Sequence, residues 1–428
     1  MSRSRISDVL AWEAMDSRGN PTVGCRVRLA GGAEGIATVP SGASTGSHEA
    51  RELRDGGERY AGLGVADAVS NVKEFLGPAV IGMDVASLDR VDAALEEIDG
   101  TPDLRRLGAN AVLAVSIASW LAAADAEQIP LYASLDSREP LLPMPMVNII
   151  SGGAHAVGGV DLQDFLVIPV GATSFAQAIE WAWMVRQSVG VLVAERGLSP
   201  SLVADEGGLG PPLESNSEAL DLLLLGIERA GLEPQSEVAI AVDVAATRLR
   251  FEGGYHLASE GRKVSVSEWL AELEEWSRRY PIVSLEDPFA EDDWDAWRAI
   301  THKLGPSLQL IGDDLFATRL QRLERGIEER AANSILVKPN QAGSLSRAQE
   351  ALKRAAEAGY ATVVSARSGD TEDSWLADLA VGWRAGQIKV GSTARSERTS
   401  KWNRLLMIEA ELEGACALAS WPPNDGKT

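Results

Sequence analysis

Three acidic side chains in the second half of the chain each stand at the end of a short apolar run. They are Asp243, Glu286 and Asp313. If these runs are strands that meet at one rim, the carboxylates repel one another and raise each other's pKa values unless a cation lies between them. Oxygen ligands favour a hard dication such as Mg²⁺ over zinc or copper. The pattern therefore predicts a magnesium site, although each residue taken alone could instead cap a helix or form a loop salt bridge.

Two lysines, Lys338 and Lys389, end further apolar runs. A lysine in such a place is costly to bury unless it is paired or functional. Near a dication its ammonium form is disfavoured, so its pKa falls and the amine becomes a usable general base. The alternative is a lysine that only neutralises the carboxylates.

Other candidate residues stand beside glycines or at the end of another apolar run. Arg367 and Ser368 join a guanidinium fork to a hydroxyl, a combination that suits a phosphate or a carboxylate. Glu206 lies in a glycine-rich loop that can approach a ligand, so it is a candidate acid or else a solvated carboxylate. His155 follows a pair of glycines, but a lone histidine is more often structural. The small, flexible segment 41–46 is either a plain turn or a lid that closes over a ligand.

The elements that must position these residues form a repeating pattern after residue 146. Six apolar runs are separated by 22 to 43 residues, and each interval can hold a helix and a return loop. This spacing is typical of βαβ units, and the chain beyond residue 138 is long enough for a closed β/α barrel. In such a barrel the chemistry lies at the carboxyl ends of the strands, which is where the charged residues fall.

The N-terminal part of the chain has a different pattern. Residues 5–40 alternate as strands do, and helical periods follow from Val65 to Ala126. The proline-containing segment 139–146 favours an extended connector. We therefore expect an N-terminal α+β domain over residues 1–138 and a catalytic barrel over residues 139–428.

Composition limits the partners and the compartment. The chain has 428 residues, a formal net charge of -22 and a sequence pI of about 4.7. Such a surface repels nucleic acid and anionic membranes, so neither is an expected partner. Two cysteines far apart in sequence, and an N-terminus without a signal-peptide pattern, suggest a reducing, cytoplasmic location. The apolar segment 111–124 is expected to be a buried helix and not a membrane span.

Several motifs together resemble one known family, the enolases, which dehydrate 2-phosphoglycerate. The resemblance extends over nearly the whole chain. It implies an N-terminal α+β capping domain followed by a modified (β/α)8 TIM-type barrel, in a homodimer or higher homo-oligomer. The motifs that carry it are Asp16-Ser-Arg-Gly-Asn-Pro-Thr-Val23, Val39-Pro-Ser-Gly-Ala-Ser-Thr-Gly46, Asp205-Glu-Gly-Gly208, Ser284-Leu-Glu-Asp-Pro288, Gly312-Asp-Asp-Leu315, Ser334-Ile-Leu-Val-Lys338 and Arg367-Ser-Gly369.

The resemblance implies two magnesium ions in each active site. Asp243, Glu286 and Asp313 match the family's ligands of the tightly held ion. Ser44 matches the ligand of a second ion that arrives with the substrate. Two dications stabilise the enolate that forms when a proton is removed beside a carboxylate.

The resemblance also implies a base, an acid and a set of contacts to a small phosphorylated or phosphonylated carboxylate. Lys338 matches the base that removes the α-proton, as in other enolase-type sites. Glu206 matches the acid that helps the hydroxyl leave, and Lys389 matches the contact to the substrate carboxylate. The remaining matches, at the phosphate clamp and the closing loop, are Arg367, Ser368 and His155.

The chain departs from the family pattern around the leaving group and the phosphate. Ala366 replaces an active-site histidine, and Asp164 replaces a glutamate near the leaving hydroxyl. Ser151 replaces the usual asparagine, and Pro339 follows the base where a larger apolar residue is common. The metal and base residues are retained, so these departures suggest either drift within an ordinary enolase or a changed substrate.

Three functions fit this pattern. The first is a divergent enolase that interconverts 2-phosphoglycerate and phosphoenolpyruvate. The second is a biosynthetic paralogue such as carboxyphosphonoenolpyruvate synthase of phosphonate natural-product biosynthesis. The third belongs to another class, a catalytically inactive enolase-fold protein with a binding or structural role.

Overall fold

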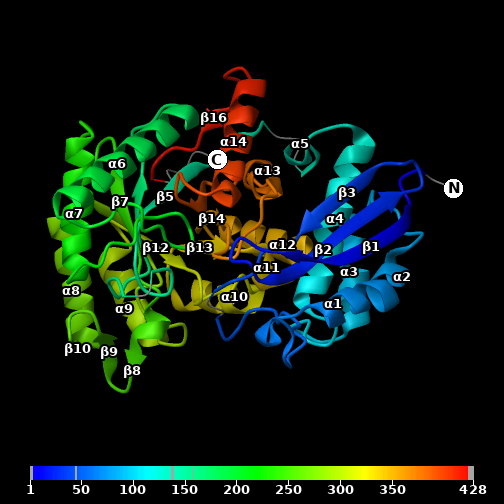
Figure 1. The fold of residues 1–428 in the computed structure, drawn as a ribbon, viewed down its shortest axis with the longest axis horizontal. Helices are drawn as coiled ribbons and strands as arrows, with labels where there is room; N and C mark the ends of the chain where they lie inside the picture. The colour runs from blue at the N-terminus through cyan, green and yellow to red at the C-terminus, as the bar shows by residue number, and fades with distance from the viewer. Residues whose placement is uncertain (1–2, 44–45, 136–138, 157, 423–428) are drawn as a thin grey trace.

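The computed structural model describes residues 3–43, 46–135, 139–156 and 158–422, which form two parts (Figure 1). The N-terminal part contains an antiparallel sheet of β1 (Ile6–Met15), β2 (Pro21–Leu29) and β3 (Glu34–Thr38), in that order. Its helical segments are η1 (Arg59–Gly62), α1 (Ala66–Asn71), the π-helical turn η2 (Val72–Leu76), α2 (Gly77–Val80), α3 (Leu88–Asp99), α4 (Ala109–Glu127) and α5 (Leu131–Leu135).

Helix α4 forms the core of this N-terminal part. It is long and apolar enough to cross a membrane, but most of its surface is buried by the sheet and the neighbouring helices. Gly35 of β3 allows the close approach, because a Cβ there would lie 2.1 Å from the carbonyl oxygen of Ala118 on α4. The helix is therefore part of a packed core, as the sequence predicted.

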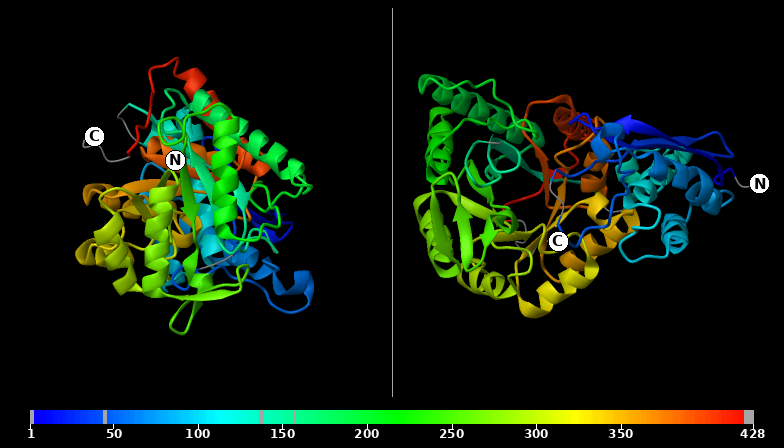
Figure 2. Two further views of the ribbon diagram at one scale, coloured as in Figure 1. Left: turned by 90° about the vertical axis from the view of Figure 1, so that its left-hand side faces the viewer. Right: turned by 60° about the horizontal axis from the view of Figure 1, so that its bottom comes forward.

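The second part is a closed eight-stranded barrel (Figure 2). Strands run in the order β11, β12, β13, β14, β15, β5, β6, β7, and β6 is antiparallel to both of its neighbours. Antiparallel strands need no crossover helix, so β5 passes directly to β6 and two helices then precede β7. The strands are β5 (Met144–Ser151), β6 (Asp164–Ile168), β7 (Ala239–Asp243), β11 (Ile282–Glu286), β12 (Gln309–Gly312), β13 (Ser334–Val337), β14 (Ala361–Ser365) and β15 (Gln387–Gly391).

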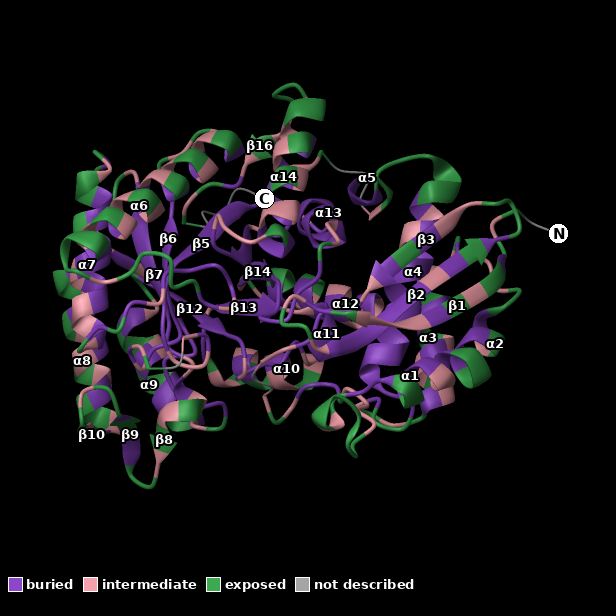
Figure 3. Cartoon of the chain, in the orientation of Figure 1, coloured by how far each residue is buried: buried purple, intermediate pink, exposed green. Residues whose placement is uncertain are grey.

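Helices surround the barrel with their apolar faces inward (Figure 3). Side chains cap several of them, and Ser265 with Glu268 forms a full capping box at α8. The helices are α6 (Phe175–Glu195), α7 (Asn216–Arg229), α8 (Val266–Arg279), α9 (Trp294–Leu304), α10 (Leu320–Glu329), α11 (Pro339–Ala342), α12 (Leu345–Glu357), α13 (Trp375–Gly382) and α14 (Ser396–Glu411). Small additions are the turn η3 (Ala246–Leu249), the sheet of β8 (Arg250–Phe251), β9 (Gly254–Leu257) and β10 (Arg262–Ser265), and the pair β4 (Leu141–Leu142) with β16 (Ala417–Leu418).

Toward the amino ends of the parallel strands the barrel interior is mostly apolar, with a small buried polar group in which Gln309 Nε2 donates to Ser334 Oγ at 3.0 Å and to Gln387 Oε1 at 2.5 Å. A separate cluster of buried side chains fills that end, and it includes Met144, Met146, Ile168, Leu336 and Ala419. The charged residues lie toward the other end of the same strands. The expected α+β capping domain and modified barrel are therefore both present, and the six apolar runs correspond to β7 and β11 to β15.

A buried carboxylate joins the two parts of the molecule. Asp92 of α3 accepts hydrogen bonds from the backbone N–H (3.0 Å) and hydroxyl (2.6 Å) of Ser346, in the first turn of α12. The indole of Trp120 donates to the same oxygen at 3.3 Å. Burial raises the pKa of Asp92 from 3.8 to about 6, against the opposing effect of these hydrogen bonds.

This shift predicts a pH dependence of stability. The folded protein holds the Asp92 proton more tightly than the unfolded chain, so the contribution of Asp92 to stability is complete below pH 3.8 and is lost as the pH rises through about 6. Between these values the free energy of unfolding should fall by about 3 kcal/mol relative to Asp92→Asn, at 1.36 kcal/mol per pKa unit. Denaturant unfolding of both proteins from pH 4 to 7 measures the difference, with exposed Asp89→Asn on the same helix as the control. Parallel stability curves for wild type and Asp92→Asn would contradict the assignment.

Candidate active site

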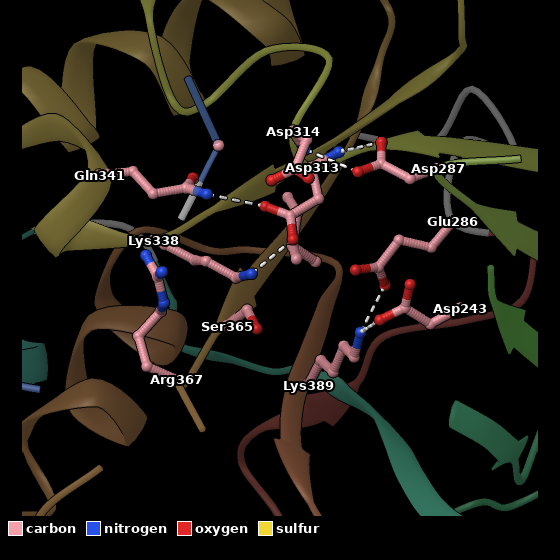
Figure 4. Close-up of polar contacts among 12 residues, drawn as sticks. Asp243, Glu286, Asp287, Asp313, Asp314, Lys338, Gln341, Ser365, Arg367 and Lys389 are labelled. Carbon is pink, nitrogen blue, oxygen red and sulfur yellow. Dashed lines mark hydrogen bonds and ion pairs between the residues drawn. The ribbon is translucent and has the colours of Figure 1, made fainter. Parts of the chain in front are cut away.

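The three predicted carboxylates lie at one rim of the barrel (Figure 4). Asp243 and Glu286 are the last residues of β7 and β11, and they are register partners in the parallel pair. Asp313 directly follows β12, the next strand around the barrel. All three are almost completely buried. Since parallel strands end at the same edge, the positions in the sequence are enough to bring the carboxylates together.

Both predicted lysines reach this group of carboxylates. The Nζ of Lys389, within β15, lies 2.7 Å from Asp243 Oδ2 and 2.7 Å from Glu286 Oε2. The Nζ of Lys338, just after β13, lies 2.5 Å from Asp313 Oδ2. The other oxygen of Asp313 accepts a hydrogen bond of 2.9 Å from Gln341. The five charged residues therefore form two adjacent ion-paired groups.

Burial and pairing shift the pKa values of these groups in opposite directions. Burial, and after it the Asp243 charge, raises the pKa of Glu286 well above its ordinary value. Burial also acts to raise the pKa of Asp313, but the Lys338 ammonium prevails and the net shift is downward.

The two lysines are shifted toward their ammonium forms. Burial lowers the pKa of Lys338, but Asp313 raises it by more. For Lys389, burial also acts downward, and Asp243 and Glu286 raise the pKa well above its usual value. The pKa of Lys338 is raised because its Nζ is paired directly with the Asp313 carboxylate, and the lowering expected beside a dication stays a prediction.

The chemistry of the three carboxylates fits a hard divalent cation. Asp243, Glu286 and Asp313 offer only oxygen ligands. The Oε1 atom of Glu286 is buried and has no hydrogen-bond partner within the part of the chain that the structure covers. A buried carboxylate oxygen without a partner is costly, and a cation would satisfy it. These residues would hold Mg²⁺ at the barrel rim.

A fourth carboxylate, Asp287, orients the loop that carries Asp313. Its two oxygens accept the backbone N–H groups of Asp313 at 2.9 Å and Asp314 at 2.7 Å. Asp287 has φ of 41°, a left-handed conformation that is uncommon outside glycine. Its role is thus to hold the backbone that presents Asp313.

The antiparallel strand β6 explains the position of Asp164. Asp164 is the first residue of β6, and its register partner is Asp243, the last residue of β7. A strand that runs backwards begins where its neighbours end, so its first residue lies at the same rim as Asp243 and Glu286. The side chain is fully buried, and it accepts hydrogen bonds from Asn148, from Ser151 Oγ at 2.9 Å and from His155 Nδ1 at 2.9 Å.

His155 lies between two carboxylates. Its Nδ1 contacts Asp164, and its Nε2 lies 3.9 Å from Glu206 Oε1. Burial acts to lower the pKa of His155, but the charges of Asp164 and Glu206 raise it by more. The net shift is upward, to about 9. The two carboxylates therefore favour the protonated form of the ring. Asp164, predicted as a substrate contact, here has His155 as its charged partner and orients that ring toward Glu206.

The predicted phosphate clamp lies on the loop after β14. Arg367 is buried, and its guanidinium donates to Glu49 at 2.9 Å and Asn340 at 2.9 Å. The Ser368 hydroxyl accepts a hydrogen bond of 2.5 Å from the backbone N–H of Ala43. Ala366 is buried beside them, and its N–H donates to the carbonyl of Lys389 at 2.9 Å. Ser44, the predicted ligand of a second magnesium ion, lies outside the described residues.

Sequence patterns did not identify four residues that contact the predicted site. Gln341 and Asn340 follow Lys338 within one helical turn, and Gln163 Nε2 donates to Asp243 Oδ2 at 3.0 Å. Glu49 comes from the N-terminal part and pairs with Arg367. Proximity in sequence to Lys338 and Asp164 was a usable signal for the first three. The position of Glu49, three residues after the small segment 41–46, was the only signal for the fourth.

Fold and site together define a class of protein, the capped β/α barrels with buried carboxylates and lysines gathered at the carboxyl rim. Residues 6–135 match the model of the enolase N-terminal domain, and residues 139–421 match that of the enolase C-terminal TIM barrel domain. The chain therefore belongs to the enolase family. Membership of this family makes it a lyase-type enzyme.

The metal site predicts a magnesium-dependent stabilisation. A ligand that binds only the folded state at 100 times its Kd stabilises it by about 2.7 kcal/mol. The melting temperature of the wild type should rise accordingly with added MgCl₂, and Glu286→Gln should lose most of that rise. Asp292→Asn is the matched control, because Asp292 belongs to a separate acidic group with His48 and Glu291. A rise that is lost in Asp292→Asn but kept in Glu286→Gln would place the ion elsewhere.

Proposed function

We propose that this enzyme removes the α-proton from a small phosphorylated or phosphonylated carboxylate and eliminates a hydroxyl group from it. The substrate is 2-phosphoglycerate or a close analogue, and the product is phosphoenolpyruvate or its analogue. The observation that carries the proposal is the contact of 2.5 Å between Lys338 and Asp313, beside the buried pair Asp243 and Glu286. This contact supports the proposal because the residue proposed as the base touches a residue proposed as a magnesium ligand.

Magnesium would supply positive charge that stabilises the enolate as it develops. The proposal includes two ions per active site, with Asp243, Glu286 and Asp313 for the first and Ser44 for the second. A cation on Asp313 would withdraw the negative charge that now raises the pKa of Lys338. The Lys338 amine would then accept the proton of the substrate's C–H bond.

The other side chains act on the rest of the substrate. The Lys389 ammonium binds the substrate carboxylate, and Arg367 with Ser368 binds the phosphorus group. Glu206 donates a proton to the departing hydroxyl, which leaves as water when the C–O bond breaks. The His155 imidazolium, 3.9 Å from Glu206, stabilises the carboxylate that this transfer leaves behind.

A specific observation favours a second candidate, a biosynthetic paralogue such as carboxyphosphonoenolpyruvate synthase. Asp164 accepts hydrogen bonds from Asn148, Ser151 and His155, so its carboxylate is already occupied by donors of the protein. Ala366 carries no donor where the family has an imidazole. Asp164 contacts His155 beside Glu206, and Ala366 directly precedes Arg367, so both differences adjoin residues proposed to contact the leaving group and the phosphorus group.

The proposal also includes a homodimer or higher homo-oligomer in the cytoplasm, without nucleic acid or membrane partners. Support comes from the family resemblance and from the formal net charge of -22. Sedimentation of the purified protein would measure the assembly.

An absorbance assay tests the proposed reaction. Purified protein with 2-phosphoglycerate and magnesium should produce phosphoenolpyruvate, and Lys338→Ala should lower the rate by about 10³-fold, within the range for loss of a general base. Lys353→Ala, which removes an exposed lysine of α12, should leave the rate unchanged. Exchange of the α-proton with deuterium without product would favour the paralogue. Neither turnover nor exchange would favour the inactive, binding or structural role.

A double substitution separates the two enzyme candidates. If the departures adapt the site to another substrate, Ala366→His with Asp164→Glu should raise kcat/KM for 2-phosphoglycerate, because a donor and a longer carboxylate are restored. Lys353→Ala, which changes an exposed side chain of α12, is again the control. A folded double variant without any gain would count against the paralogue.

A further inference from the structure

Arg398 is a fully buried arginine that lies directly beneath the proposed phosphate clamp. It comes from the first turn of α14, and its guanidinium donates to the carbonyl oxygens of Arg367 at 2.7 Å, Ser368 at 2.7 Å and Val390 at 2.9 Å. A buried guanidinium normally faces a carboxylate. Here the hydrogen bonds go to backbone oxygens, and Glu397 lies at 3.4 Å from Nε. The Arg398 side chain therefore stabilises the backbone at Arg367, Ser368 and Val390.

Two of the three carbonyl groups belong to consecutive peptide units. They are the peptides Arg367–Ser368 and Ser368–Gly369. Each peptide unit is planar, so fixing the direction of a carbonyl also fixes the opposed N–H. The Gly369 N–H donates to the carbonyl of Ser41 at 2.9 Å. Arg398 thereby fixes the orientation of the two peptide units that carry the guanidinium of Arg367 and the hydroxyl of Ser368.

The third carbonyl belongs to the residue after Lys389. At the next position, Gly391 has φ of 118°, and a Cβ there would lie 2.9 Å from Arg398 Cδ and 2.6 Å from the carbonyl oxygen of Glu206. The same Glu206 oxygen accepts the N–H of Ser392 at 2.8 Å. Arg398 thus packs against the strand end that carries Lys389 and against the segment that touches the loop of Glu206.

Other contacts hold the clamp loop at different points. Lys401 of α14 donates to Asp370 at 2.6 Å, and Asp370 accepts the N–H of Arg367 at 3.1 Å. The Ser17 hydroxyl donates to the Ser368 carbonyl at 3.3 Å, a longer bond than that from Arg398. Among the residues that the structure describes, Arg398 is the one side chain that donates hydrogen bonds to both the Arg367 and Ser368 carbonyls.

We propose that Arg398 is a positioning residue for the clamp, which aligns Arg367 and Ser368 to bind the phosphorus-containing anion of the substrate. The inference rests on the proposed function, because it takes Arg367 and Ser368 as the anion site. It adds a residue that touches no substrate and acts through the backbone. A misplacement of about 1 Å can cost 10²-fold in a preorganised site.

The test uses inorganic phosphate as the probe, with saturating magnesium, in calorimetric titrations of the full-length protein. Arg398→Met should weaken phosphate binding by about 10-fold or more while leaving the affinity for magnesium alone unchanged, because the metal residues lie on other strands. Arg398→Lys, which keeps a charged donor, should recover part of the phosphate affinity. A role in stability alone would lower the melting temperature without this selective loss.

Two further variants make the result decisive. Arg404 lies on the same helix as Arg398, and Arg404→Met removes its ion pair with Asp378 of α13 (2.7 Å), so it should lower stability but keep phosphate affinity. Arg367→Met should lose phosphate affinity because it removes the clamp itself. Unchanged affinity in Arg367→Met would refute the clamp in the proposed function, and the inference with it.

The inference alone fails if Arg367→Met loses phosphate binding and a folded Arg398→Met keeps it. If Arg398→Met does not fold, Arg398→Lys decides the question. A folded Arg398→Lys with weakened phosphate affinity and normal magnesium affinity supports the positioning role. A folded Arg398→Lys with wild-type affinity for both overturns it.

Discussion

The organisation of this molecule depends on one electrostatic constraint, which is that three carboxylates are buried at a single rim. Asp243, Glu286 and Asp313 cannot all remain ionised out of water without positive charge beside them. The structure supplies this charge through Lys389, which bridges the first two, and through Lys338, which pairs with the third. The same requirement explains why a dication would suit the rim, since its charge would take over part of the neutralisation of the carboxylates.

The inverted strand β6 adds a second kind of group to this rim. In a fully parallel barrel the first residue of a strand would lie at the end away from this rim, but Asp164 begins an antiparallel strand and lies opposite Asp243. It orients His155, which in turn faces Glu206. The reversal of one strand therefore allows an acidic residue at a strand's start to take part in the site, beside those at the strands' ends.

The N-terminal part completes the site and does not only cover it. Glu49 pairs with Arg367, and Ser41 exchanges backbone hydrogen bonds with Gly369 at 2.7 and 2.9 Å. Arg398 holds the opposite side of the same loop. The clamp is thus held between a segment of the capping domain and a helix of the barrel, so that its geometry depends on how the two parts pack.

The sequence by itself determined the βαβ spacing, the charged residues at the strand ends and the family resemblance, because period, spacing and residue type are local properties. Those signals predicted the barrel and the meeting of Asp243, Glu286 and Asp313. Only the tertiary structure decided the pairing of Lys338 with Asp313, the partnership of Asp164 with His155, and the contributions of Glu49 and Arg398. These depend on side-chain directions and on contacts between residues far apart in the chain, such as Glu49 and Arg367, for which no local pattern carries a signal.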